Sequence, residues 1–453
     1  MMPLFLKLAA PILRPRWLAL FLVLCGGAAV GGYFWWTWRA TENLVPQAQA
    51  AAADRDFDRA KALLQAYLAA RPGDGKAHFL LAQVCRRARA EDFEQAYQEL
   101  YQARHFGYSG ADVELESALL TIQEKGPSGL PPKALQECLD SHGPEEALAL
   151  EALARGCIDH NRLDEANGWL NRWIAAAPDD WYGRLWRGAL FEFTNNPGPA
   201  AGDFEFVCAK RPSDEAIRLR LGVMLSFTGS DCSKALRYLE PYHRDHPESA
   251  EAAVAVARCR RLQVQLEQAA ALLKPVLNAH PDDIDALLLM AQVAADGGDD
   301  RSALDYLHRL KPLIQRSHSA AFLGRLRRLE PVVNHLDAPD RMHHVYLLTA
   351  TILGRMGRTE EAKQYLADVD QIDGLQKDIA KAVDACNRNP RDLAALENAG
   401  MLYLKVGMPD DAIDALERVV KENPKDVAAH QALAEAQRQF AEPARPSPNP
   451  REP

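Results

Sequence analysis

The sequence lacks the motifs that mark the common nucleotide-binding and hydrolytic enzymes. It contains no G-x-x-x-x-G-K-[ST] loop, and "GDGKAH" at Gly73 to His78 lacks both the leading glycine and the Ser or Thr. The patterns G-x-S-x-G, H-E-x-x-H and G-x-G-x-x-G are absent as well. We therefore expect a protein that is not an enzyme, with no catalytic residues and no cofactor.

Cysteine is sparse, and no two cysteines form a C-x-x-C pair among the 8 in 453 residues. Zinc sites usually show paired ligands at short spacing, and disulfide frameworks occur in short, cysteine-dense chains. Neither "YHRDH" (His243, His246) nor the pair His343 and His344 has carboxylates and cysteines at a metal-binding spacing. We expect no metal site and interpret the cysteines as buried packing residues.

Clustered basic residues are also scarce. The formal net charge is -9, of which the first 40 residues contribute +4 through Lys7, Arg14, Arg16 and Arg39, so the rest of the chain carries -13. Binding to nucleic acid needs clustered Lys and Arg side chains that displace counterions from phosphates. The sequence therefore excludes broad binding of nucleic acid.

One long hydrophobic run is present, close to the N-terminus. The stretch from Trp17 to Trp38, "WLALFLVLCGGAAVGGYFWWTW", contains no charge and is long enough for a helix to cross about 30 Å of hydrocarbon. Aromatic residues crowd its far end, as they do where helices meet the membrane interface. We predict a transmembrane helix over 17–38, preceded by a short basic segment over 1–16, so that a membrane is one partner of this chain.

Two other interpretations of this run stay open. A cleaved signal peptide also has a basic stretch before an apolar one such as "LALFLVL". A lipoprotein signal would end at "LVLC", although Leu24 stands where that motif needs a small residue.

Within the run, Gly27 and Gly31 form a G-x-x-x-G pair, and this spacing lets two membrane helices approach closely. The pair predicts a homodimer, while small residues also occur in membrane helices that do not pair.

The charges around the run predict its orientation. Lys7, Arg14 and Arg16 precede it and only Arg39 follows closely, so the positive-inside rule keeps the short N-terminus in the cytoplasm. The Ala, Arg and Pro richness is typical of a bacterial chain. We therefore expect a single-pass protein of the bacterial inner membrane whose C-terminal part is periplasmic.

A period of about 34 residues dominates the rest of the chain. The alanines at the start of a helical pattern recur at this spacing, namely Ala166, Ala200, Ala235, Ala269 and Ala303. A proline follows most of them within about three helical turns, as in "APDD", "RPSD", "HPES" and "HPDD", where it stops the helix and the next polar residues can cap another. Each unit therefore predicts a helix, a turn, a second helix and a stop, with small residues where the two helices touch.

This pattern closely resembles the tetratricopeptide repeat family. The resemblance covers roughly residues 41–440, and one of the most similar units matches at Gly400, Tyr403, Ala412, Leu416 and Pro424. It implies an all-α fold, a right-handed α-solenoid of stacked antiparallel helix pairs, with a concave wall built mainly from the first helices. We assign a solenoid to 41–330, continuing repeats with an irregular insert and a capping helix to 331–440, and a disordered Pro-rich tail to 441–453.

Four stretches depart from the period. Residues 110–145 predict a degenerate unit, and the unit over 304–345 is irregular and lacks its stop proline. Ala82 and Ala96 lie farther apart than usual, which predicts a longer turn between their helices. The gap between Ala362 and Ala412 is long enough for an extra helix or two, around "IDGLQKDIAKAVDACNRNP".

The resemblance also implies a protein or peptide partner, because concave walls of this family usually bind an extended peptide or a helix. A frame set by Gly188 places seven residues on the wall: Tyr182, Leu185, Glu192, Phe193, Phe227, Arg258 and Arg261. Aromatic residues followed by arginines predict a peptide groove, although the same residues could be ordinary packing and solvated positions.

We therefore expect a membrane-tethered scaffold that binds partner proteins and helps to assemble or position a membrane-associated complex. One alternative is an accessory subunit of a membrane enzyme, for example in envelope or polysaccharide assembly, which predicts a stable complex with a synthase. Another is a protein similar to organelle import receptors, whose solenoid would face the cytosol.

Overall fold

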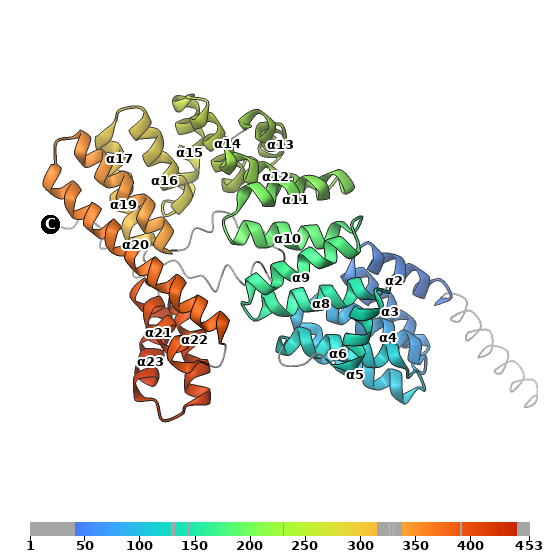
Figure 1. Cartoon of the computed structure of the whole chain (residues 1–453). Helices are drawn as coiled ribbons and strands as arrows, with labels where there is room; N and C mark the ends of the chain where they lie inside the picture. The colour runs from blue at the N-terminus through green and yellow to red at the C-terminus, as the bar shows by residue number, and fades with distance from the viewer. Residues whose placement is uncertain are drawn as a thin grey trace, which may run out of the picture. The chain divides into compact units, whose positions relative to one another are not determined.

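The computed structural model describes residues 41–127, 132–143, 145–229, 231–314, 326, 329, 338–389 and 392–441. This part of the chain contains 21 α-helices, one short 3-10 helix and no strand, so the all-α, tetratricopeptide-like solenoid is confirmed (Figure 1). The predicted membrane helix Trp17–Trp38, with Gly27 and Gly31, and nearly all of the predicted tail lie outside the described residues. Among the helices within 41–441 that the structure describes, none is both long and apolar enough to cross a membrane.

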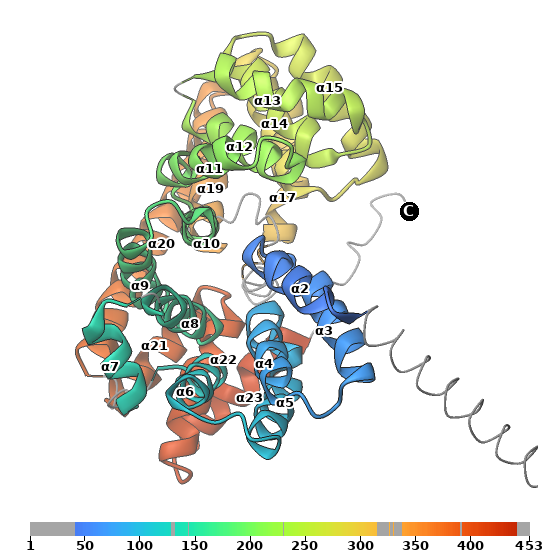
Figure 2. The same cartoon turned by 90° about the vertical axis from the view of Figure 1, so that its right-hand side faces the viewer.

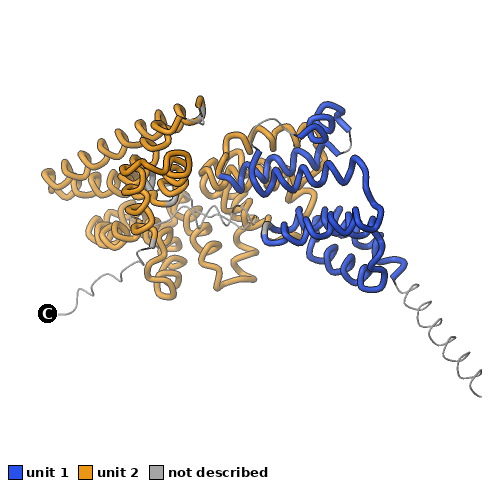
Figure 3. The backbone as a smooth tube through the Cα atoms, turned by 90° about the horizontal axis from the view of Figure 1, so that it is seen from below, with its two compact units in different colours: residues 1–160 blue, residues 161–453 orange. Residues whose placement is uncertain are grey.

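The chain divides into two compact units, Met1–His160 and Asn161–Pro453 (Figure 3). The first unit contains α2 (Leu44–Ala53), α3 (Phe57–Ala70), α4 (Gly75–Ala88), η1 (Ala90–Asp92), α5 (Phe93–His105), α6 (Ala111–Lys125), α7 (Lys133–Ser141) and α8 (Glu146–Asp159). The segment boundaries assigned from the sequence stay predictions.

The second unit holds the most regular repeats (Figure 2). Its helices are α9 (Leu163–Ala176), α10 (Trp181–Phe193), α11 (Pro197–Lys210), α12 (Glu215–Thr228), α13 (Cys232–Asp245), α14 (Ala250–Leu262), α15 (Leu266–Ala279), α16 (Ile284–Asp296), α17 (Asp300–Ile314), α19 (Ala338–Arg355), α20 (Thr359–Arg388), α21 (Leu393–Lys405), α22 (Pro409–Glu422) and α23 (Val427–Ala441).

The first helix of each regular pair begins at a capping residue that follows a stop proline. The side chain of Asp214 accepts a hydrogen bond from the Ile217 backbone N–H at 3.2 Å, and that of Asp283 accepts one from Ala286 at 2.8 Å. Ser249 caps α14 in the same way. Each such cap stabilises its helix by about 1 kcal/mol. The cap motif after each proline, expected from the sequence, therefore forms.

Small residues let the two helices of a pair approach closely. A Cβ added to Gly188 on α10 would lie 2.8 Å from Cε1 of Phe204 on α11, closer than real Cβ atoms approach another atom. A Cβ added to Gly222 would likewise lie 2.7 Å from Cγ of Leu239, and one added to Gly400 would lie 2.6 Å from Cγ of Leu416. The backbone of the first helix thus packs directly on side chains of the second.

The first helices of the second unit lie on its concave side. α12 packs against α14 and α14 packs against α16, whereas the second helices α11, α13 and α15 have at most marginal contacts with one another (Figure 1). Closer packing among α12, α14 and α16 curves this part of the stack toward the first helices. We call the faces of α10, α12, α14 and α16 that line this side the inner wall.

Two of the four irregular stretches, the one between Ala82 and Ala96 and the one after Ala362, have different outcomes. Between α4 and α5 the longer turn folds into η1. The stretch after Ala362, in contrast, holds no separate extra helix, because α20 runs without interruption from Thr359 to Arg388 over 30 residues. No proline occurs in the sequence until Pro390, so nothing breaks the hydrogen-bond ladder, and the second helix of this pair is simply extended.

Candidate functional site

The centre of the inner wall is a buried ion pair between neighbouring first helices. The Arg220 guanidinium on α12 donates from Nε to the Glu192 carboxylate on α10 at 3.0 Å, and its Nη2 contacts the same oxygen. Both side chains are almost fully buried, and the guanidinium also lies over the ring of Phe204. Two charges so deep in the protein must stay together, because either one alone would lack solvation.

Arg220 also binds a distant part of the chain. Its Nη1 donates a hydrogen bond to the backbone carbonyl of Leu329 at 3.1 Å, across 109 positions in sequence. The Leu329 N–H in turn donates to the carbonyl of Leu326, whose side chain is fully buried. These two residues belong to the connection between α17 and α19. The inner wall therefore holds a turn of another segment through a backbone carbonyl group.

The arginines expected on the wall contact residues of the adjacent first helices. Arg258 on α14 stacks on the ring of Phe227 on α12 at 3.7 Å from the ring centroid, and its Nη1 donates to the Ser226 hydroxyl at 3.1 Å. Arg261 lies 3.4 Å from the carboxylate of Asp296 on α16. Burial lowers the pKa of the Arg258 guanidinium to about 10, which leaves it charged near neutral pH.

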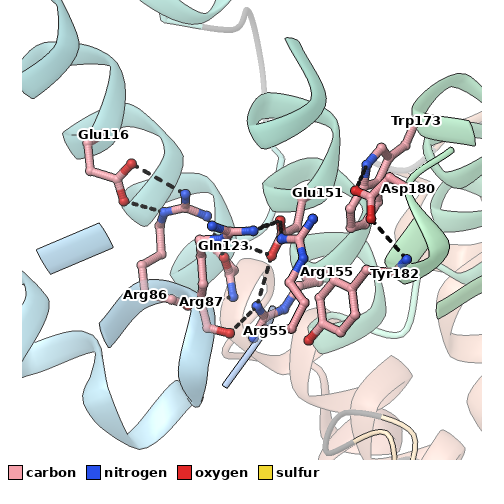
Figure 4. A network of polar contacts seen from close by, with 10 residues as sticks. All are labelled: Arg55, Arg86, Arg87, Glu116, Gln123, Glu151, Arg155, Trp173, Asp180 and Tyr182. Atoms are coloured by element: carbon pink, nitrogen blue, oxygen red, sulfur yellow. Dashed lines mark hydrogen bonds and ion pairs between the residues drawn. The ribbon is translucent and has the colours of Figure 1, made fainter. Parts of the chain in front are cut away.

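The expected aromatic residues on α10 lie deeper than the arginines. Tyr182, Leu185 and Phe193 each keep only 8% of their surface exposed. The ring of Tyr182 meets Trp173 edge-on, and Asp180 fixes this corner by accepting hydrogen bonds from the Tyr182 N–H at 3.0 Å and from the Trp173 indole at 3.2 Å (Figure 4). These side chains support the wall from within, while Phe227, Arg258 and Arg261 are half-buried and reach its surface.

Sequence reasoning missed the residue that connects these groups. Arg220 stands in the apolar stretch "IRLRLGVMLSF" of α12, and it was not among the seven predicted wall residues. The available signal was a positive charge at a position one repeat after Trp186, where a core helix should be apolar. Leu329 gave no signal, because its contact spans more than three repeats.

The first unit contains a separate buried polar cluster around Glu151 on α8 (Figure 4). The Glu151 carboxylate is 1% exposed and accepts hydrogen bonds from Arg55 at 3.1 Å and from Arg87 at 2.9 Å. Arg155, one turn along α8, lies 3.5 Å from the same carboxylate and donates to the backbone carbonyl of Arg87 at 2.6 Å. The cluster ties the end of α2 and the end of α4 to α8.

A second pair in this unit follows the same principle. Arg86 is fully buried and donates from Nε to Glu116 on α6 at 2.5 Å and from Nη1 to Gln123 at 3.2 Å. The Gln123 amide completes the arrangement by donating to the Arg86 carbonyl. Each polar group has a partner in another helix, so this arrangement fixes the packing of α4 on α6.

The described residues contain no cluster of metal-binding side chains. Within them, no three His, Cys, Asp or Glu side chains come close enough together to hold a metal ion. The Nε2 atom of His343 lies 3.3 Å from the carboxylate of Asp373, and both side chains are partly exposed.

Comparison with known proteins agrees with this fold. Profiles described as tetratricopeptide repeats match residues 45–107, 133–180 and 393–436. This chain contains tetratricopeptide repeats. Proteins built from these repeats are generally scaffolds for protein interactions. No curated protein matches the chain.

Several solved structures are similar at low identity. Yeast Tom70 is 14% identical over 90% of this chain and 91% of its own, with a TM-score of 0.36. The tetratricopeptide domain of P58(IPK) is 13% identical over 88% and 98%, with a TM-score of 0.27. MamA from Desulfovibrio magneticus RS-1 is 19% identical over 38% and 96%, with a TM-score of 0.32. Scores this low support no conclusion about what the chain binds.

Proposed function

We propose that this protein is a non-enzymatic scaffold that binds an extended segment of a partner protein on the inner wall. The hydrogen bond from Arg220 to the Leu329 carbonyl carries the proposal. It is made to a backbone group, which every peptide offers, and it holds a segment that is remote in sequence. A wall that holds one such segment has the chemistry to hold another.

The surface next to Arg220 supplies what such a segment needs. Phe227 offers apolar area, and the charged Arg258 stacked on it offers donors for carbonyl or carboxylate oxygens. Aromatic and arginine side chains carry much of the binding energy in protein interfaces. This platform, Phe227 with Arg258, is the part of the predicted groove on which we expect a partner to depend.

A matched pair of double variants tests the proposal. Phe206 on the second helix α11 is also half-buried under an arginine, with Arg184 at 4.3 Å from its ring centroid. The full-length chain would be cross-linked mildly in cells and purified from membranes. Phe227→Ala with Arg258→Ala should remove a defined partner, whereas Phe206→Ala with Arg184→Ala should keep it. Equal retention in both variants, with helical content unchanged, would place the binding surface elsewhere.

We further propose that the scaffold is tethered to the bacterial inner membrane through Trp17–Trp38, with the solenoid in the periplasm. The uncharged run and the excess of basic residues before it support this placement. Deletion of residues 1–40 should move the chain from the membrane to the soluble fraction.

The placement of the solenoid is tested separately. In intact spheroplasts an added protease should cut the solenoid. Protection of the solenoid until the cells are lysed would instead favour a cytosolic solenoid.

The anchor is also proposed to pair with a second copy. Gly27 and Gly31 provide the small-residue spacing for close helix contact. Gly27→Ile with Gly31→Ile should abolish a dimer that is cross-linked in membranes, and a dimer that survives both changes would exclude this route.

A further inference from the structure

Two cysteines that are distant in sequence lie together where α13 begins and α14 ends. Cys232 is the first residue of α13, and Cys259 lies in the last turn of α14, which packs against α13. Three residues before Cys232, Gly229 faces Leu262, three residues after Cys259: a Cβ on Gly229 would be 3.5 Å from the Leu262 Cδ1. The antiparallel order therefore places position 232 opposite position 259.

The side chains of the two cysteines are neighbours within this contact. The thiols of Cys232 and Cys259 interact electrostatically, so the two side chains lie close together. The Cys232 thiol also lies 4.0 Å from the carbonyl oxygen of Gly229, in the turn that approaches Leu262 of α14. Cys259 is fully buried, while Cys232 is half-buried and can be reached from solvent. One thiol is thus accessible from solvent, and the other is buried close to it.

We propose that Cys232 and Cys259 form a redox-sensitive pair that closes to a disulfide between α13 and α14 when a disulfide oxidant is present. The bond would join the second helix of one repeat to the first helix of the next. Arg258 of the platform directly precedes Cys259, so the bond would also fix the segment that carries this guanidinium against Phe227.

The reaction balances as two thiol–disulfide exchanges. The Cys232 thiolate attacks one sulfur of an oxidant R–S–S–R, forms a mixed disulfide and releases R–S⁻, which takes up a proton. Cys259 then loses its proton, attacks the Cys232 sulfur and expels the second R–S⁻. Two protein thiols are oxidised, and one small disulfide is reduced to two thiols. Burial, together with the contact to Cys232, raises the pKa of Cys259 to about 12, so we expect the second step to be the slow one.

Oxidised glutathione is the probe that tests this pair in the purified full-length chain. After incubation, the chain would be unfolded, its remaining thiols blocked with N-ethylmaleimide, and its peptides identified by mass spectrometry. We expect a peptide that contains Cys232 joined to one that contains Cys259. Oxidation should raise the melting temperature by about 5 °C, reversed by dithiothreitol, because the bond closes a loop in the unfolded chain.

Single variants separate the closed pair from simple surface oxidation. Cys259→Ser should leave Cys232 as a lasting glutathione adduct, because no second thiol resolves it. Cys208→Ser, on α11, is the matched control and should leave the joined peptides unchanged. A lasting glutathione adduct on Cys232 in the unaltered chain would overturn the proposal. If both Cys232 and Cys259 carried N-ethylmaleimide after prolonged oxidation, neither thiol would have been oxidised, and this result would also overturn the proposal.

Discussion

At the scale of the residue, the glycines of the first helices set how closely each pair packs. Gly188→Ala would place a methyl group 2.8 Å from the Phe204 ring, and we expect it to lower the free energy of unfolding by about 1–3 kcal/mol. Gly202→Ala, on the partner helix α11, meets nothing within 4 Å and should stabilise by about 0.5–1 kcal/mol. Urea unfolding followed by circular dichroism measures both. Equal effects of the two changes would refute the steric explanation.

The turns between first and second helices contain a residue with a costly backbone conformation. Asn195, Gly229, Val264 and Gly298 occupy equivalent turns with φ of 53°, 65°, 61° and 78°. Asparagine and glycine tolerate this left-handed region, whereas a β-branched side chain is strained there. Val264 is 78% exposed, so its side chain gains little from packing.

This strain leads to a prediction of increased stability. Val264→Gly should stabilise the chain by about 1 kcal/mol, because the lost strain exceeds the entropy that glycine adds to the unfolded state. The reverse change at the next turn, Gly298→Val, should destabilise it by a similar amount or more. Thermal unfolding compares the two, and a fall in melting temperature for Val264→Gly would contradict the assignment of strain.

At the scale of the element, the Glu192–Arg220 pair joins α10 to α12 within the second unit. Arg220→Met leaves a buried carboxylate without its partner, and we expect a loss of about 3–5 kcal/mol. Adding Glu192→Leu should restore most of that loss, because two apolar side chains replace two charges. A double-mutant cycle with urea unfolding measures the coupling, and simple additivity of the two losses would show that the pair does not act as a unit.

The regular helices were predictable because their causes are local. Each cap, stop proline and small contact residue lies within one repeat of its partner, as Asp283 with Ala286 or Gly222 with Leu239. The extension of α20 was missed because the spacing between Ala362 and Ala412 gives only the number of residues between two helix–helix contacts. It does not say how many helices those residues form. The absence of a proline between Thr359 and Pro390 was the signal that favoured one long helix over two short ones.

At the scale of the whole molecule, the period of about 34 residues predicts the stacking, because each repeat contacts only its neighbours. It does not predict contacts that skip repeats. The hydrogen bond from Arg220 to Leu329 spans 109 positions, and the proximity of Cys232 to Cys259 depends on the register of two antiparallel helices. The wall residues were predicted by position, but their depth was not, since Tyr182 and Phe193 are buried while Phe227 reaches the surface.

The central claim is that the inner wall of the second unit binds an extended segment of a partner. Site-specific photo-cross-linking tests it most directly, with benzoylphenylalanine placed at Phe227 or, as the control, at Phe206 of the full-length chain in cells. We predict one discrete product from position 227, mapped by mass spectrometry to a single short segment of the partner, and little product from position 206. Equal products from both positions, or a product from position 206 alone, would contradict the claim.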